Sequence, residues 1–84
     1  MKVEKLIKKL LSKPTPSEMD YEDVKKILEH EGWKLDRIKG SHFIFTNNGG
    51  TITLPLHRGV IKKEYLREEI IKKLSLEEKY GKGK

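Results

Sequence analysis

The fold of this chain of 84 residues depends on one stretch, His42-Phe43-Ile44-Phe45-Thr46-Asn47-Asn48-Gly49-Gly50-Thr51-Ile52-Thr53-Leu54-Pro55. Its centre, residues 47–50, is typical of a hairpin turn, because Asn and Gly tolerate a positive φ. The apolar and β-branched residues on both sides predict strands over 42–46 and 51–54, and Pro55 ends the second strand. The stretch therefore predicts a β-hairpin.

The two faces of this hairpin differ in chemistry. Alternation places Phe43, Phe45, Ile52 and Leu54 on a core face. By the same parity, the opposite face carries the remaining side chains of both strands and that of a histidine just beyond them: His42, Ile44, Thr46, Thr51, Thr53 and His57. Both histidines are therefore expected on a face that no helix covers.

Helical patterns flank the hairpin. Apolar residues recur at helical spacing from Val3 to Leu11 and predict an amphipathic helix over 1–12, followed by a Pro-rich linker over 13–19. Asp20 as N-cap and Gly32 as stop signal bound a second helix. Alternation over 33–37 predicts the first strand. A repeat of Leu and Ile at every fourth residue predicts a last helix from about 62 to 74.

This order of elements defines the fold class. One helix, three strands and one helix in two layers predict an α+β domain, α-β-β-β-α with a three-stranded antiparallel sheet, over 20–75. The helix over 1–12 is extra, and its apolar stripe must be covered by the domain or by a partner. The basic tail over 76–84 shows no packing face and is expected to be disordered.

Length and composition exclude several classes of protein. A chain this short forms one domain and has no room for a deep cleft that would hold a small-molecule cofactor. The absence of cysteine excludes disulfides, thiolate zinc sites and a cysteine nucleophile. No apolar run reaches the roughly 20 residues of a membrane span, and the charged N-terminus is unlike a signal peptide. A soluble cytoplasmic protein is expected.

The positive charge is unevenly placed along the chain. The formal net charge is +6, and most of the excess falls in residues 33–63, which contain six Lys or Arg and one acidic residue. A localised basic patch is typical of proteins that bind nucleic acid. Small lysine-rich proteins are also basic simply for solubility, so charge alone leaves both interpretations open.

The basic turn Arg37-Ile38-Lys39-Gly40-Ser41-His42 lies within this segment. Histidine gains and loses a proton near neutral pH, so His42 is the candidate general acid or base of a reaction at a phosphate. Arg37 and Lys39 would stabilise charge on phosphoryl oxygens without a metal. Ser41 would donate a hydrogen bond to phosphate, and Gly40 would form the turn. The alternative is a histidine that merely begins a strand.

Other residues are weaker candidates. His57 offers a second acid or base, but two histidines without a nearby carboxylate or thiolate are too few ligands for a zinc site, so no metal is expected. Arg58 adds charge in the same loop. Lys62 and Lys63, at the start of the last helix, would either hold phosphate together with free backbone N–H groups or be solvated. His30 near a helix C-terminus is explained by the helix dipole.

These residues together resemble the HicA (YcfA-like) toxin family. The resemblance spans roughly residues 20–74. It rests on Gly32-Trp33, on the Gly-Ser-His sequence that ends at His42, on Ile52-Thr53-Leu54-Pro55 with His57, and on a Lys-led helix. The family implies a fold similar to the double-stranded RNA-binding domain and a metal-independent endoribonuclease that cleaves mRNA with His42. It also implies a HicB-type antitoxin that covers the site. Residues 1–19 and the tail go beyond the family pattern.

Two other functions fit the same residues. The chain would also suit a non-catalytic RNA-binding module of this fold, in which phosphate contacts give salt-sensitive binding with little sequence preference. It would alternatively be a protein-interaction module whose first helix docks a partner. In both cases His42 would have no catalytic role.

Overall fold

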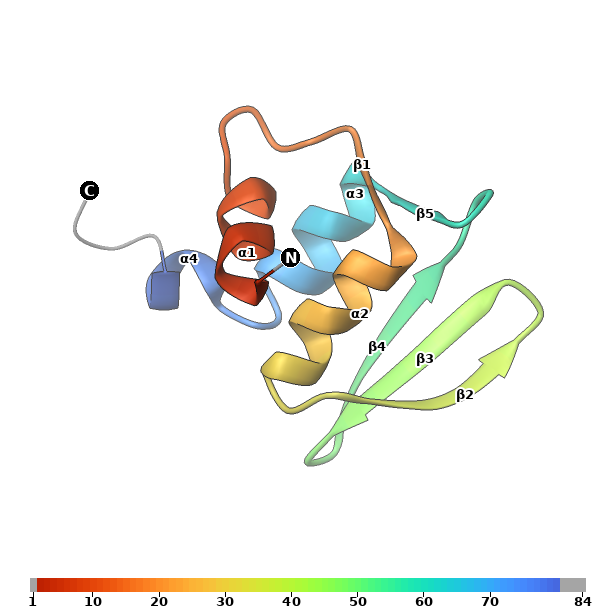
Figure 1. The fold of residues 1–84 in the computed structure, drawn as a ribbon. Coiled ribbons are helices and arrows are strands. Elements are labelled where there is room, and N and C mark those ends of the chain that lie inside the picture. The colour runs from red at the N-terminus through yellow and green to blue at the C-terminus, as the bar shows by residue number, and fades with distance from the viewer. Residues whose placement is uncertain (1, 81–84) are drawn as a thin grey trace.

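The predicted hairpin is the centre of a three-stranded antiparallel sheet (Figure 1). The computed structural model describes residues 2–80. Strand β3 (His42–Asn47) pairs with β4 (Gly50–Pro55) through a turn in which Asn48 and Gly49 have φ of 48° and 86°. Strand β2 (Lys34–Lys39) pairs with the other edge of β3. The strand order β2-β3-β4 confirms the predicted sheet.

The helices lie together on one side of this sheet (Figure 1). They are α1 (Val3–Leu10), α2 (Tyr21–His30), α3 (Lys63–Tyr65) and α4 (Leu76–Tyr80), and α3 continues directly into a π-helical segment, η1 (Leu66–Ile71). The architecture confirms the predicted α+β class and the α-β-β-β-α order resembling a double-stranded RNA-binding domain. Within residues 2–80, no helix is long and apolar enough to span a bilayer.

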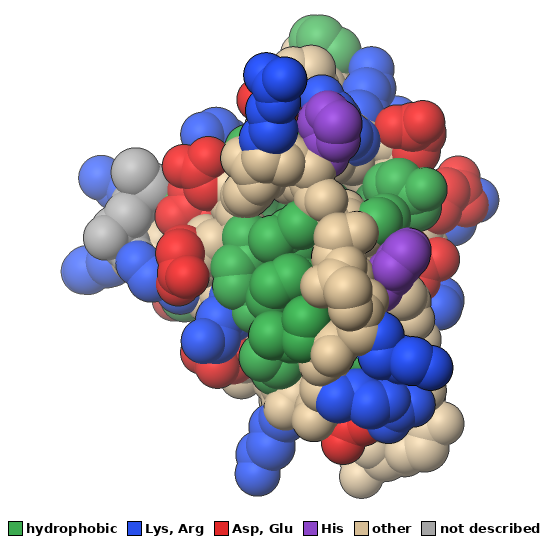
Figure 2. Space-filling model, turned by 90° about the vertical axis from the view of Figure 1, so that its right-hand side faces the viewer, with side chains coloured by type: hydrophobic (Ala, Val, Ile, Leu, Met, Phe, Trp, Pro, Cys, Tyr) green, Lys and Arg blue, Asp and Glu red, His purple; other side chains and the backbone are tan. Residues whose placement is uncertain are grey.

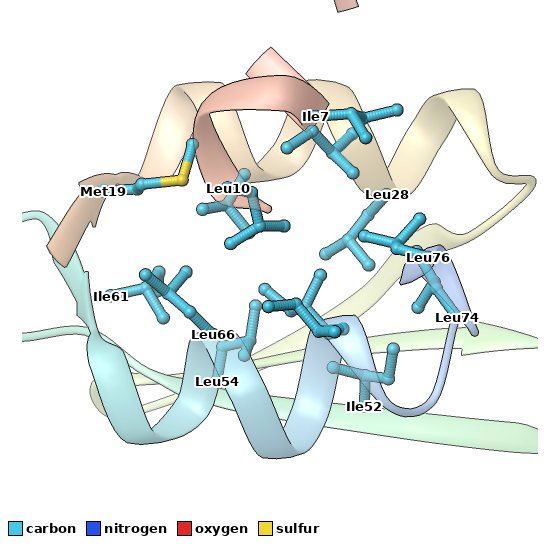
Figure 3. Close-up of a cluster of buried hydrophobic side chains, with 14 of the residues drawn as sticks. Ile7, Leu10, Met19, Leu28, Ile52, Leu54, Ile61, Leu66, Leu74 and Leu76 are labelled. Carbon is cyan, nitrogen blue, oxygen red and sulfur yellow. The ribbon is translucent and has the colours of Figure 1, made fainter. Parts of the chain in front are cut away.

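The core forms between the helices and the covered face of the sheet (Figure 3). Phe45, Ile52 and Leu54 are fully buried there, as alternation predicted. On α1, Leu6 and Leu10 are also fully buried, Val3 and Leu11 at the ends of the stripe are partly buried, and α1 packs against α2. The first helix is thus covered by its own domain and not by a partner.

The end of the expected linker belongs to a strand. Residues Glu18–Asp20 form β1, which pairs antiparallel with β5 (Val60–Lys62) in a separate two-stranded sheet. Met19 is opposite Ile61, and both side chains are buried in the core. Burial of Met19 fixes this segment against β5, so the prediction of a linker over 13–19 is wrong from Glu18 onward.

The segment expected to be a disordered tail is ordered at its start. Ser75, with φ of 54°, turns the chain, and α4 follows. The Leu76 side chain is fully buried in the core, and Lys79 Nζ lies 2.8 Å from Glu31 Oε1. The prediction of disorder is therefore wrong for 76–80, because one leucine reaches the core. Residues 81–84 lie outside the described part.

The last predicted helix is irregular. Its predicted apolar residues, Leu66, Ile70, Ile71 and Leu74, are all buried. The Lys72 N–H donates to the Arg67 carbonyl at 3.1 Å, a bond five residues back that defines a π-helical turn. The helical path thus ends at Ile71, earlier than the predicted residue 74.

Candidate functional site

A β-bulge in β2 determines which cations share a face with His42. The register runs Lys34 opposite Thr46 and Leu35 opposite Phe45, then skips Asp36 and resumes with Arg37 opposite Ile44. A bulge inserts one extra residue and thereby reverses the alternation after it. The strand predicted from 33–37 is present as β2, and the skip at Asp36 turns Arg37 to the face opposite Leu35.

The bulge places three cations in a row on the open face. Directly opposed residues of antiparallel strands point to the same side of the sheet. Lys34, Arg37 and Lys39 therefore share the face of β3 residues Thr46, Ile44 and His42. All three cations and His42 are exposed. Lys34 was not among the predicted site residues, although its place in the basic segment 33–63 was visible in the sequence.

The turn before His42 is a tight hairpin. Lys39 lies opposite His42, which leaves Gly40 and Ser41 as the two turn residues. Gly40 has φ of +60°, which a type II′ turn requires at its first central position. The Leu56 N–H donates to the Ser41 carbonyl at 2.8 Å. This bond fastens the turn to the end of β4, so the backbone around His42 is held from both sides.

The loop after β4 brings His57 and Arg58 to this end of the sheet. His57 and Val60 exchange backbone hydrogen bonds of 3.0 and 3.2 Å around a second tight turn. Arg58 and Gly59 have φ of 56° and 80° in it. The His57 and Arg58 side chains are exposed. Because Leu56 is bonded to Ser41, the two turns that carry the predicted histidines are neighbours.

Two apolar residues of β3 differ in burial from what their faces alone would suggest. Ile44 faces the open side as predicted but is only 8% exposed, because it lies on the central strand between Arg37 and Thr53. Phe43 was predicted in the core and is only half-buried; its ring centroid lies 4.6 Å from that of Tyr21. Ile38, opposite Phe43, is 51% exposed. Figure 2 shows hydrophobic side chains gathered on one face of the molecule, beside histidine and Lys or Arg side chains.

The open face carries unbalanced positive charge. The Arg37 guanidinium contacts the Asp36 carboxylate. In residues 2–80, neither Lys34 nor Lys39 is paired with a carboxylate. Unpaired cations on an exposed face attract a polyanion. No group of three or more potential metal ligands occurs in the same described range.

Lys62 and Lys63 are placed apart from this face. Lys62 lies in β5, and its Nζ is 3.2 Å from Glu18 Oε1, which partly neutralises it. Lys63 begins α3, and its backbone N–H donates to the Ser17 carbonyl at 2.9 Å. That N–H is therefore not free for a phosphate, which was one of the two interpretations of this pair. Both residues lie outside the three-stranded sheet.

The comparison with known proteins agrees with this arrangement. A family model described as HicA toxin of bacterial toxin–antitoxin matches residues 21–76, about two thirds of the chain. The match runs from α2 to the start of α4 and contains the whole sheet and the turn before His42. No curated protein and no solved structure matches the chain. The resemblance seen in the sequence is thereby confirmed: the chain belongs to the HicA family of toxins from bacterial toxin–antitoxin systems.

Proposed function

We propose that this toxin is an endoribonuclease that cleaves RNA without a metal, with His42 as its general acid or base. The observation that carries the proposal is the shared face of Arg37, Lys39 and His42, which the pairing of β2 with β3 produces. A proton-transferring group beside fixed cations is what cleavage at a phosphate requires. The face is exposed and shallow, which suits a strand of RNA.

The reaction follows from these groups. The ribose 2′-oxygen attacks the adjacent phosphorus, forming the O2′–P bond, and the P–O5′ bond breaks. A neutral imidazole accepts the 2′-OH proton, or a protonated one donates to the leaving 5′-oxygen. The products are a 2′,3′-cyclic phosphate and a 5′-hydroxyl. Negative charge that grows on the phosphoryl oxygens faces Lys39 and Arg37, which replace a metal ion in stabilising it.

The neighbouring residues would hold the strand. Ser41 offers a hydroxyl next to His42, and the positive φ of Gly40 shapes the turn that presents both. Lys34 extends the row of cations along β2. His57 and Arg58 would contact RNA at the end of the sheet. Lys62 and Lys63 would contact it only away from the cleaved phosphate, because they lie outside the sheet.

A HicB-type antitoxin is the partner that we propose for this face. A protein that covers His42 would neutralise Lys34 and Lys39 with carboxylates. The buried stripe of α1 removes the main argument for a protein-interaction module based on that helix, so an RNA-binding module is the alternative to be tested.

The test compares His42→Ala with His30→Ala. Both histidines are exposed, and His30 lies at the end of α2, outside the proposed site. Surface substitutions change stability by only about 0.5 kcal/mol, so both variants should fold. With a chelator present, wild type and His30→Ala should cleave RNA, and His42→Ala should be slower by a factor of about 100 or more.

Three results would contradict the proposal. Equal cleavage rates of His42→Ala and wild type would exclude His42 as the acid or base. If wild type binds RNA with a strong salt dependence but never cleaves it, the chain is an RNA-binding module. Loss of wild-type cleavage on chelation would show that a metal takes part.

A further inference from the structure

A second basic region lies on the helical side of the molecule. The loop between α1 and β1 passes beside α3 and η1 (Figure 1) and encloses a hollow of about 290 Å³. None of the residues that line it belongs to the three-stranded sheet. They come from the loop and from one side of α3 and η1: Leu11, Ser12, Lys13, Pro14, Thr15, Lys63, Arg67, Ile71 and Lys72.

The charged residues of this lining are all cations. Lys72 Nζ is paired with Glu68 Oε1 at 3.0 Å. Across residues 2–80, Lys13, Lys63 and Arg67 form no ion pair. Three like charges that face one hollow repel each other, and apolar walls strengthen their combined field. An anion in the hollow would relieve this repulsion.

The loop is held in place beside the helix by two hydrogen bonds. Arg67 Nη1 donates to Thr15 Oγ1 at 3.3 Å, and the Lys63 N–H donates to the Ser17 carbonyl at 2.9 Å. Arginine carries five N–H donors, so Arg67 can bind the loop and an anion together. The loop that carries Lys13 is therefore held beside Lys63 and Arg67 before any ligand binds.

We propose that this hollow binds a phosphate group of an RNA strand, at a place separate from the sheet face of His42. The inference rests on the proposed function for the source of the phosphate. Arg and Lys are the residues that recognise phosphate. The volume lies just below the roughly 300–1,000 Å³ of small-molecule pockets, so a phosphate group of a strand fits inside it. Lys63, which lies outside the three-stranded sheet, would contact the phosphate in this hollow.

The experiment compares Lys13→Gln/Lys63→Gln with Lys5→Gln/Lys8→Gln. The first pair leaves the Arg67–Thr15 bond intact, and the second removes the same charge from exposed positions on α1. Titration with inorganic phosphate is followed by the amide NMR shifts of Thr15 and Lys63. Binding of a 2′-O-methyl RNA, which lacks the attacking hydroxyl, is measured over a range of salt concentrations.

Phosphate should shift both amides in wild type and in the α1 pair, and not in the hollow pair. The salt slope for RNA should fall by about 0.7 for each phosphate that the hollow pair no longer neutralises, and stay unchanged in the α1 pair. Equal behaviour of the two pairs in both titrations would overturn the inference. A phosphate effect without an RNA effect would overturn RNA as the source. Failure of the cleavage test at His42 with both effects present would reject the proposed function alone.

Discussion

Lys39 and His42 lie directly opposite each other across the Gly40–Ser41 turn and point to the same face of the sheet. Opposed side chains of antiparallel strands have Cβ atoms about 5 Å apart. A phosphate that touches the His42 imidazole therefore lies within reach of the Lys39 ammonium. In the proposed reaction, the two ends of one hairpin turn would supply proton transfer and charge stabilisation.

Replacement of Lys39 by Gln should slow RNA cleavage about tenfold or more, because the variant has no ammonium beside the phosphoryl oxygens. Stability should be unchanged, because Lys39 is exposed. Single-turnover cleavage rates measure the effect, with Lys5→Gln on α1 as the charge-matched control. Equal rates for the two variants would show that Lys39 has no part in the reaction.

Asp36→Asn should strengthen RNA binding. The carboxylate contacts the Arg37 guanidinium and offsets its charge, so its removal makes Arg37 available to phosphate. The salt slope of binding should steepen by about 0.7, which corresponds to one more neutralised phosphate. Glu4→Gln removes an equal charge from the first turn of α1 and should leave the slope unchanged. A weaker complex for Asp36→Asn would contradict the role given to this carboxylate.

Gly40→Ala should lower the free energy of unfolding by about 1 kcal/mol or more through backbone strain, because an L side chain rarely adopts φ of +60°. An added Cβ meets no atom within 4 Å, so steric clash does not contribute. Urea unfolding measures the loss, and Ser41→Ala serves as the exposed control. A neutral Gly40→Ala would mean that the turn relaxes to another type.

Leu76→Ala should destabilise the protein by about 2–5 kcal/mol, as truncation of a buried leucine does. The Leu76 side chain is fully buried in the cluster of Figure 3. Glu78→Ala, two residues on and exposed, should change little. Urea denaturation compares the two. A loss below about 0.5 kcal/mol for Leu76→Ala would return residues 76–80 to the disordered tail first expected.

Tyr21 gives the protein an alkaline pH dependence. Burial, reinforced by the Glu22 and Glu29 carboxylates, raises the pKa of the Tyr21 hydroxyl above its ordinary value of 10.0. The folded state therefore retains this proton more strongly than the unfolded state, and its contribution is lost as pH rises beyond 10. Relative to Tyr21→Phe, which keeps the ring contact with Phe43, wild type should lose stability above pH 10 and not below it. Urea midpoints across this pH range measure the difference, and parallel curves would contradict it.

Local sequence patterns were sufficient to predict the hairpin and the residues of its core. The Asn-Gly turn, the alternation of Phe45 and Ile52, and the repeat of Leu66 and Ile70 depend on residues close in the chain. Turn chemistry and periodicity are local properties, so they appear in the sequence directly. The Gly-Ser-His turn that carries the proposed acid or base was visible for the same reason.

Tertiary contacts set which cations on β2 share the face of His42, and they also set where residues 18–20 and Leu76 pack. The skip at Asp36 depends on how β2 pairs with β3, and the pairing of Glu18 with Lys62 joins residues far apart in sequence. Leu76 is buried because α4 packs against α1 and η1. Pairing register and burial are set by contacts between distant segments. The local turn therefore placed Lys39 beside His42, and the register of β2 against β3 placed Lys34 on the same face.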